Sequence, residues 1–137
     1  MPSGGSCMPP DESLKHLHDI REAAGRVVRF AAGRTRQDYG ADDYFRSAVE
    51  RQFEIIGEAL NRLLKADPAT AGRISEHRRI IGFRNVLIHG YDAVDDAITW
   101  RIIEEKLPIL LRELDALLPT APPADNPPRE APGPESQ

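Results

Sequence analysis

The sequence has little cysteine, no long apolar run and no secretory signal, and each absence excludes a class of protein or site. Its 137 residues include one cysteine, Cys7, so neither an internal disulfide nor a cysteine-based zinc site can form. The longest apolar runs span only a few residues, which is too short for a transmembrane helix. The segment from Met1 to Cys7 lacks the basic and apolar regions of a secretory signal. We therefore expect a cytoplasmic protein that is not embedded in a membrane.

Lysine is also scarce: three of the 18 basic residues are lysines and the other fifteen are arginines. The net charge of −4 argues against a protein that binds nucleic acid through its overall charge. Between Arg62 and Arg84, however, six basic residues stand against two acidic ones, which is a local net charge of +4. Arginine has a planar fork that suits phosphate. A solvated basic face or a set of ion pairs would produce the same pattern.

No segment shows the alternation of a β-strand, whereas apolar residues recur at three- and four-residue steps in four segments. We expect these segments to be helices over residues 11–33, 42–67, 75–90 and 94–118, with Ser75 as the cap of the third. Residues 34–40 are predicted to be a loop and residues 67–74 a short connection. Pro108 removes a hydrogen bond within the last helix and should bend it. The pattern predicts an all-α fold, an antiparallel up-and-down bundle of about four main helices.

The two ends of the chain have a different composition from the middle. Proline and glycine are frequent in residues 1–10, and residues 119–137 hold seven prolines. Such segments cannot bury enough apolar surface to offset the entropy of ordering them. We expect a disordered leader over residues 1–10, one folded domain over residues 11–118, and a disordered proline-rich tail over residues 119–137.

The stretch from Arg84 to Asp92 is the most informative part of the sequence. Asn85 and His89 are four residues apart and share one face of a helix, and the long side chain of Arg84 can reach the same volume. Histidine can transfer protons near neutral pH, and arginine can stabilise the charge that develops on a phosphate. These groups suffice to cleave RNA without a metal, by attack of its own 2′-hydroxyl. Alternatively, His89 caps its helix and Arg84 pairs with a nearby aspartate.

The spacing Arg84-x4-His89-x-Tyr91 resembles the signature of the HepT-like toxins in the HEPN superfamily. Other segments, in the same order, resemble that family: Ile56-Gly57-Glu58-Ala59, Ile81-Gly82-Phe83, Val94-Asp95-Asp96 and Leu107-Pro108. The resemblance covers residues 11–118. It implies a helical homodimer and a metal-independent endoribonuclease with RNA as its substrate. It also implies a nucleotidyltransferase antitoxin as partner, which silences the toxin by transferring AMP to the motif tyrosine. Whether homodimer and antitoxin form a larger complex stays open at this point.

Carried over to this chain, the resemblance makes Arg84 and His89 catalytic, Asn85 supporting, and Tyr91 the acceptor of AMP. Glu58 lies on the largely apolar side of its helix, so we expect it to pair with Arg84 or Arg79 and to orient the site. Arg78 and Arg79 are candidate RNA-binding residues. His16 and His18 are two residues apart and do not face together, so no metal site is expected. No cofactor is expected either.

Two classes of function remain open at this point. In the first, the chain is a ribonuclease toxin controlled by a nucleotidyltransferase. In the second, it is a non-catalytic helical adaptor that binds such a nucleotidyltransferase. A bundle whose motif only secures the helix ends is a third interpretation.

Overall fold

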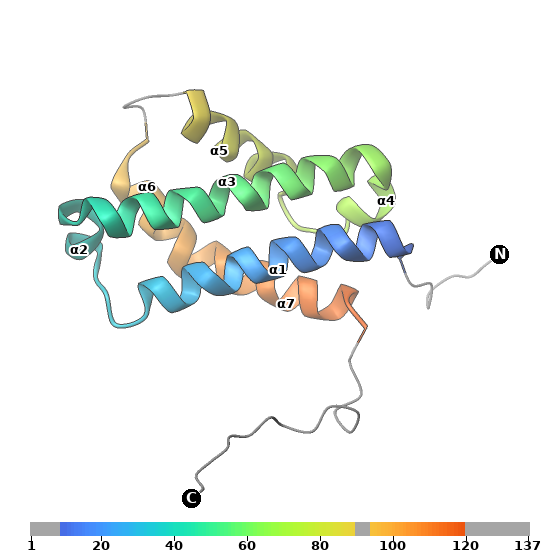
Figure 1. The fold of residues 1–137 in the computed structure, drawn as a ribbon, viewed down its shortest axis with the longest axis horizontal. Helices are drawn as coiled ribbons and strands as arrows, with labels where there is room; N and C mark the ends of the chain where they lie inside the picture. The colour runs from blue at the N-terminus through green and yellow to red at the C-terminus, as the bar shows by residue number, and fades with distance from the viewer. Residues whose placement is uncertain (1–8, 90–93, 120–137) are drawn as a thin grey trace, which may run out of the picture.

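The computed structural model describes residues 9–89 and 94–119, and these residues form helices and short connections without a strand. Figure 1 shows the order of the elements, in which the long helices run alternately in opposite directions. Their bounds are α1 Asp11–Ala31, α2 Arg36–Ala41, α3 Asp43–Ala66, α4 Pro68–Ala71, α5 His77–His89, α6 Asp96–Arg101, the π-helical segment η1 Ile102–Lys106, and α7 Leu107–Leu117. The all-α prediction is confirmed. The predicted count of four main helices stays a prediction, as do the homodimer and the domain limits.

Two short helices occupy segments that the sequence analysis assigned to loops. Helix α2 lies in the predicted loop 34–40, where Thr35 accepts a bond from the backbone of Asp38 and Asp38 accepts one from the backbone of Thr35. Helix α4 lies in the predicted connection 67–74 and is capped by Asp67. Both predictions of loop structure were wrong, because local capping stabilises a single helical turn in each place.

The start of α5 also differs from the prediction. Ser75 does not cap this helix, since its hydroxyl and its backbone N–H both bond to the carboxylate of Glu113. Glu76 has a φ of 57° and its carbonyl accepts from the N–H groups of Arg79 and Ile80, which starts the helix at His77. The predicted cap was wrong because Glu113, distant in the sequence, competes for the serine.

The last helical stretch is continuous from Asp96 to Leu117 but contains a widened turn. The N–H of Leu107 bonds to the carbonyl of Ile102, one residue farther back than in an α-helix. Pro108 follows directly and has no N–H to donate. The structure places the π-helical segment η1 directly before Pro108, and the bend expected at this proline stays a prediction.

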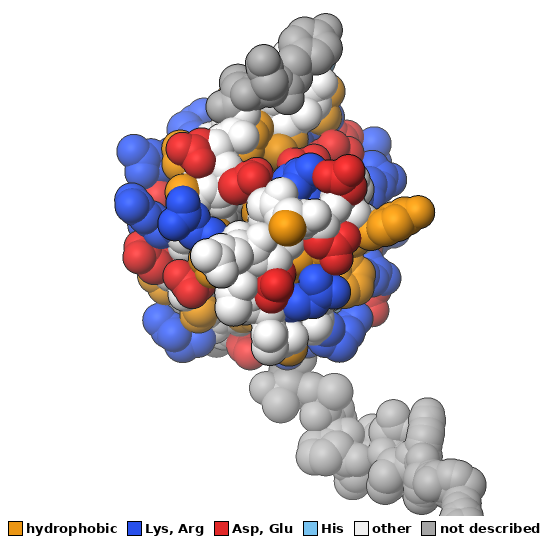
Figure 2. Space-filling view, turned by 90° about the vertical axis from the view of Figure 1, so that its left-hand side faces the viewer, with side chains coloured by type: hydrophobic (Ala, Val, Ile, Leu, Met, Phe, Trp, Pro, Cys, Tyr) orange, Lys and Arg blue, Asp and Glu red, His pale blue; other side chains and the backbone are white. Residues whose placement is uncertain are grey.

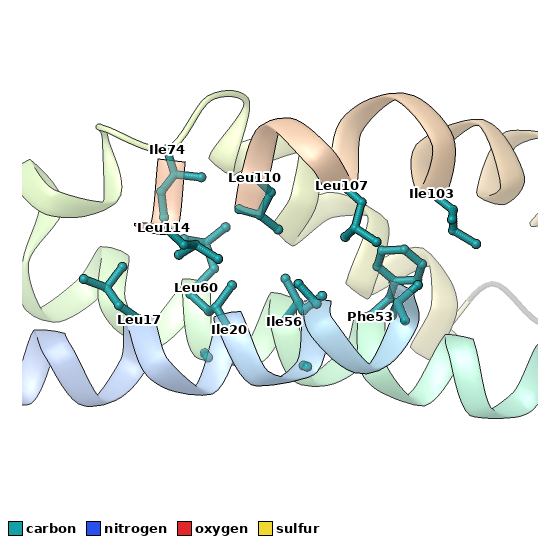
Figure 3. Close-up of a cluster of buried hydrophobic side chains, with 14 of the residues drawn as sticks. Leu17, Ile20, Phe53, Ile56, Leu60, Ile74, Ile103, Leu107, Leu110 and Leu114 are labelled. Atoms are coloured by element: carbon teal, nitrogen blue, oxygen red, sulfur yellow. The ribbon is translucent and has the colours of Figure 1, made fainter. Parts of the chain in front are cut away.

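The core lies between α1, α3 and the helices at the C-terminal end. Figure 3 shows Leu17 and Ile20 of α1 facing Phe53, Ile56 and Leu60 of α3, with side chains from η1 and α7 above them. A second cluster packs Tyr39 of α2 against Phe45 and Trp100, with ring centroids 5.5 and 5.9 Å from that of Tyr39. Burial raises the pKa of the Tyr39 hydroxyl far above its ordinary value.

Helix α5 is the exception to this close packing. It packs chiefly against α3, and none of its residues is buried. Val86 and Ile88 are about two-fifths exposed. The helix that carries the predicted motif therefore lies on the outside of the molecule, where its side chains can be reached.

Among the helices that the structure describes, none combines the length and the apolar character that a membrane span requires. Tyr91 lies outside the described residues, as do Cys7, nearly all of the predicted leader and nearly all of the predicted tail.

Candidate functional site

The guanidinium of Arg84 lies at the centre of a small polar network on α5 and α3. Its Nη2 donates to Oε1 of Glu58 at 2.7 Å, and its Nη1 donates to Oδ1 of Asn85 at 2.8 Å. The network holds the head of Arg84 by two of its nitrogens, while the side chain stays about one-quarter exposed. Of the two partners expected for Glu58, Arg84 is the one observed.

The stem of Arg84 is fixed by the backbone of α3 beneath it. A Cβ added at Gly57 would lie 2.2 Å from Cβ and 2.7 Å from Cγ of Arg84, so only glycine permits this crossing. Gly57 precedes Glu58 in the chain, and the two residues therefore act on one side chain. The first lets the Arg84 stem lie against α3, and the second bonds the guanidinium at its end.

Glu58 binds a second arginine that the sequence analysis did not single out. Nε of Arg62 donates to Oε2 of Glu58 at 2.9 Å, so each carboxylate oxygen serves a different guanidinium. Glu58 and Arg62 are four residues apart on α3, a spacing that brings side chains together on a helix. That spacing was the available signal for Arg62. The position of Gly57 under Arg84 had no comparable signal, because it depends on where two helices cross.

His89 is the last residue of α5 and is exposed. It lies one helical turn after Asn85, and Cβ atoms at this spacing are about 5–6 Å apart. In the described part of the chain, hydrogen bonds join Arg84, Asn85 and Glu58, and His89 is not part of that network. By this spacing, the exposed side chain of His89 lies on the side of α5 that Asn85 occupies.

A groove of about 590 Å³ opens beside this network. Helices α1, α3 and α5 line it, and its lining includes Glu58, Arg62, Arg84 and Ile88, the residue before His89. A substrate in the groove could reach the Arg84 guanidinium. The groove carries charges of both signs, because Arg51 and Arg62 each pair with an acid of their own helix.

Arg78 and Arg79 lie at the other end of α5 and are exposed. Arg79 pairs with Glu76 at 3.3 Å and lines a second, more apolar cavity of about 400 Å³ between α5 and α7. Hydrogen bonds from Lys106 and Arg79 lower the pKa of the Glu76 carboxyl. Of these two arginines, Arg79 lines a different cavity from Arg84, and neither lines the groove of Arg84.

The basic residues between Arg62 and Arg84 are in part explained by ion pairs. Arg62, Arg79 and Arg84 each contact a carboxylate. Figure 2 views the end of the molecule near α2, where acidic and basic side chains are interspersed over the described residues and form no continuous basic surface. A polyanion would therefore meet no broad positive surface on the described residues of this face.

The described residues contain no group of three or more histidine, cysteine, aspartate or glutamate side chains placed to hold a metal ion. The chemistry that the site offers comes from a guanidinium held by Glu58 and Asn85, with an imidazole one turn away. The first can stabilise negative charge on phosphate oxygens, and the second can transfer protons.

Comparison with known proteins assigns the chain to a family. A model described as "Ribonuclease HepT-like" matches residues 20–117, which is most of the chain. The chain belongs to the HepT-like ribonuclease family. The match includes Glu58, Arg84 and His89, so the network described above lies within the part of the chain that defines the family.

Several relatives support the HepT-like assignment. A "putative RNase" of Methanocaldococcus jannaschii is 32% identical over 72% of this chain and 90% of its own length. A "probable ribonuclease HepT" of Thermococcus cleftensis is 30% identical over 74% of this chain and 92% of its own length. A "putative RNase" of Caldanaerobacter subterraneus is 28% identical over 75% and 91%. No solved structure matches the HepT-like chain.

Proposed function

We propose that the chain is a metal-independent endoribonuclease and the toxin of a toxin–antitoxin pair. The observation that carries the proposal is the guanidinium of Arg84, which α3 and Asn85 hold beside an open groove. Because Gly57 leaves the stem of Arg84 little freedom, the side chain loses little entropy when its guanidinium binds a phosphate. Membership of the HepT-like ribonuclease family and the names of the relatives support the same conclusion.

In the proposed reaction the 2′-oxygen of one nucleotide attacks the adjacent phosphorus. The P–O5′ bond breaks, which leaves a 2′,3′-cyclic phosphate and a free 5′-hydroxyl. Arg84 stabilises the charge on the pentavalent phosphorus centre, and His89 takes a proton from the 2′-hydroxyl or gives one to the leaving 5′-oxygen. Asn85 and Glu58 support Arg84, and Arg78 and Arg79 bind RNA farther along α5.

The one motif histidine of each chain, His89, cannot act as base and acid in the same turnover without moving between the two oxygens. A two-fold homodimer that faces two sites would supply two histidines and two arginines. The uncovered apolar side chains of α5, with Val86 and Ile88 partly exposed, support a partner on this side of the molecule.

Control by a nucleotidyltransferase antitoxin is the other half of the proposal. Transfer of AMP from ATP to the Tyr91 hydroxyl would release pyrophosphate and place a bulky anion two residues from His89. That group would repel RNA from the site through its negative charge. The place of this reaction is the cytoplasm.

The test uses the purified chain and a labelled single-stranded RNA in EDTA. We expect cleavage by the wild-type chain, and loss of cleavage in Arg84→Ala and His89→Ala variants that keep their helical circular dichroism. Expression of the wild-type chain alone should stop growth, whereas neither variant should. If both variants cleave RNA as fast as the wild type, the site assignment fails. A wild-type chain that binds a nucleotidyltransferase but never cleaves RNA would be the non-catalytic adaptor.

A test of the control step is the intact mass of the chain after co-expression with a candidate nucleotidyltransferase antitoxin. We expect an added AMP mass on the wild-type chain and none on a Tyr91→Phe variant. An unchanged wild-type mass, or the same addition on Tyr91→Phe, would contradict Tyr91 as the acceptor.

A further inference from the structure

Arg62 is a charged residue at the proposed site that has no part in the proposed reaction. It bonds to Oε2 of Glu58 at 2.9 Å, while Arg84 bonds to Oε1 of the same carboxylate at 2.7 Å. Arg62 is more exposed than Arg84, with two-thirds of its side chain accessible. All three residues line the same groove. One carboxylate is thus shared between an outer and an inner arginine.

This sharing leaves the cluster of three residues with one net positive charge. Without Arg62, Glu58 would neutralise Arg84 completely and the cluster would be neutral. A neutral cluster attracts a phosphate less strongly than a positive one. The second arginine therefore determines how much of the charge of Arg84 is available to an anion in the groove.

The sharing also matters once a phosphate binds. The Arg84 stem is confined by Gly57, so only the guanidinium head can turn toward a phosphate. When its Nη2 leaves Oε1, Glu58 loses that hydrogen bond, and the loss costs more if the carboxylate, 40% exposed, keeps no other partner. Arg62 stays bonded to Oε2 and limits this cost, because Glu58 remains paired.

We propose that Arg62 is a positioning residue that acts through Glu58, by keeping this carboxylate paired while the guanidinium of Arg84 turns to a phosphate of the bound RNA. The inference rests on the proposed function, because that proposal names RNA as the ligand of the groove. It goes further in assigning to Arg62 an effect on Arg84 rather than a contact with the substrate.

A direct contact between Arg62 and RNA is the alternative that the experiment must separate. Both ideas predict weaker substrate binding in Arg62→Ala. They differ in a Glu58→Gln background, where the carboxylate charge is gone and Arg62 has no anion to hold. If Arg62 acts through Glu58, its removal costs much less in this background than in the wild type, because no carboxylate is left to compete for Arg84. If it contacts RNA, its removal is equally harmful in both backgrounds.

The measurement is kcat/KM for cleavage of a labelled single-stranded RNA by four chains: wild type, Arg62→Ala, Glu58→Gln and the double variant. We expect Arg62→Ala to lower kcat/KM about fivefold, the upper range for a pair of this exposure. The double variant should match Glu58→Gln within about twofold. The same loss in both backgrounds would overturn the inference.

Arg51→Ala is the matched control. Arg51 lies on the same helix, lines the same groove, is as exposed as Arg62 and pairs with Glu54 of its own helix at 3.4 Å. It differs in that the described contacts of Glu54 do not include Arg84. We expect Arg51→Ala to leave kcat/KM close to that of the wild type. An equal loss in Arg51→Ala would show a general effect of charge and would overturn the inference.

A second measurement tests the inference by phosphate binding, without using nuclease activity. Inorganic phosphate is titrated into the ¹⁵N-labelled chain, and the Nε–H signal of Arg84, assigned by its loss in Arg84→Lys, is followed by NMR. We expect phosphate to shift this signal, with a dissociation constant raised about fivefold by Arg62→Ala and changed by less than about twofold by that substitution in the Glu58→Gln background. A signal that phosphate does not move, or that Arg62→Ala does not affect, overturns the inference. A wild-type chain that shows the expected shift but cuts no RNA would refute the proposed function alone.

Discussion

Gly57 lies directly beneath Arg84, and a side chain at position 57 would overlap the stem of the arginine. Helix α3 would have to move away from α5 to make room for a methyl group. We expect Gly57→Ala to lower the free energy of unfolding by about 1–3 kcal/mol, the usual cost of overpacking. The value of kcat/KM should also fall, even under conditions where the variant is fully folded, because the Arg84 head would be displaced from Glu58. Urea denaturation and kcat/KM measure the two effects.

Gly82→Ala provides the control for this prediction. Gly82 is also helical, but nothing lies within 4 Å of a Cβ built there. The alanine should stabilise α5 by about 0.5–1 kcal/mol through its helix propensity, without loss of cleavage. If Gly57→Ala proves as harmless as Gly82→Ala, the close crossing of α3 and α5 is not a requirement of the site.

Replacement of Arg84 by lysine tests whether its planar shape matters in addition to its charge. The guanidinium bonds to Asn85 and Glu58 through two different nitrogens, which one ammonium group cannot reproduce with the same geometry. We expect Arg84→Lys to lower kcat by about 10²-fold or more, the scale seen when a positioned charge-stabilising group is lost. Circular dichroism should stay unchanged. A variant with nearly full activity would mean that a point charge at this position is sufficient.

The sequence predicted the helices that bury a continuous apolar stripe. Helices α1 and α3 follow directly from such stripes, and Phe53, Ile56 and Leu60 of α3 do lie in the core. Helix α2 was missed because it is a single short element whose signal is a capping pair, Thr35 and Asp38, rather than a stripe. The form of the defect before Pro108 could not be predicted, because proline indicates that a bond is missing and not how the helix rearranges.

The candidate site was predictable to the extent that it depends on spacing within one helix. Asn85 and His89 share a face by helix geometry alone, and a glutamate on an apolar stripe requires a partner. The choice of Arg84 over Arg79 as that partner depends on the crossing of α3 and α5, which brings Gly57 under Arg84. The spacing of residues along the chain does not predict where two helices cross.

The stability of the chain should depend on the ionisation of Asp67. Its Oδ2 accepts from the hydroxyls of Ser13 and Thr70, both at 2.7 Å, and its Oδ1 caps α4 through the N–H of Thr70. These bonds favour the charged form, led by the one from the Thr70 hydroxyl, and lower the pKa of Asp67 in the folded chain. A lowered folded pKa contributes stability above the unfolded value of about 4, and that stability is lost as the pH falls through the folded value.

Asp67→Asn should therefore cost about 1 kcal/mol at pH 7 and less in strong acid, where the wild-type carboxyl is also neutral. The measurement is urea denaturation at pH values from 7 down to the acid limit of folding. Asp19→Asn is the control, because Asp19 is exposed and its one ion pair in the described residues is with Lys15 at 3.7 Å. A constant difference between Asp67→Asn and the wild type at every pH would contradict the ionic part of this explanation.

Trp100 ties the C-terminal helical stretch to α2 and α3. It is 7% exposed, and its ring centroid lies 5.9 Å from that of Tyr39 and 6.1 Å from that of Phe45. We expect Trp100→Ala to lower the free energy of unfolding by about 3–5 kcal/mol, since it removes a large buried ring and leaves a cavity. Denaturation is followed by circular dichroism, because the variant lacks the one tryptophan that fluorescence would report. Tyr44→Ala removes an aromatic ring that is 90% exposed and should change stability by less than about 0.5 kcal/mol. Similar losses in the two variants would mean that α6 is not anchored through this aromatic cluster.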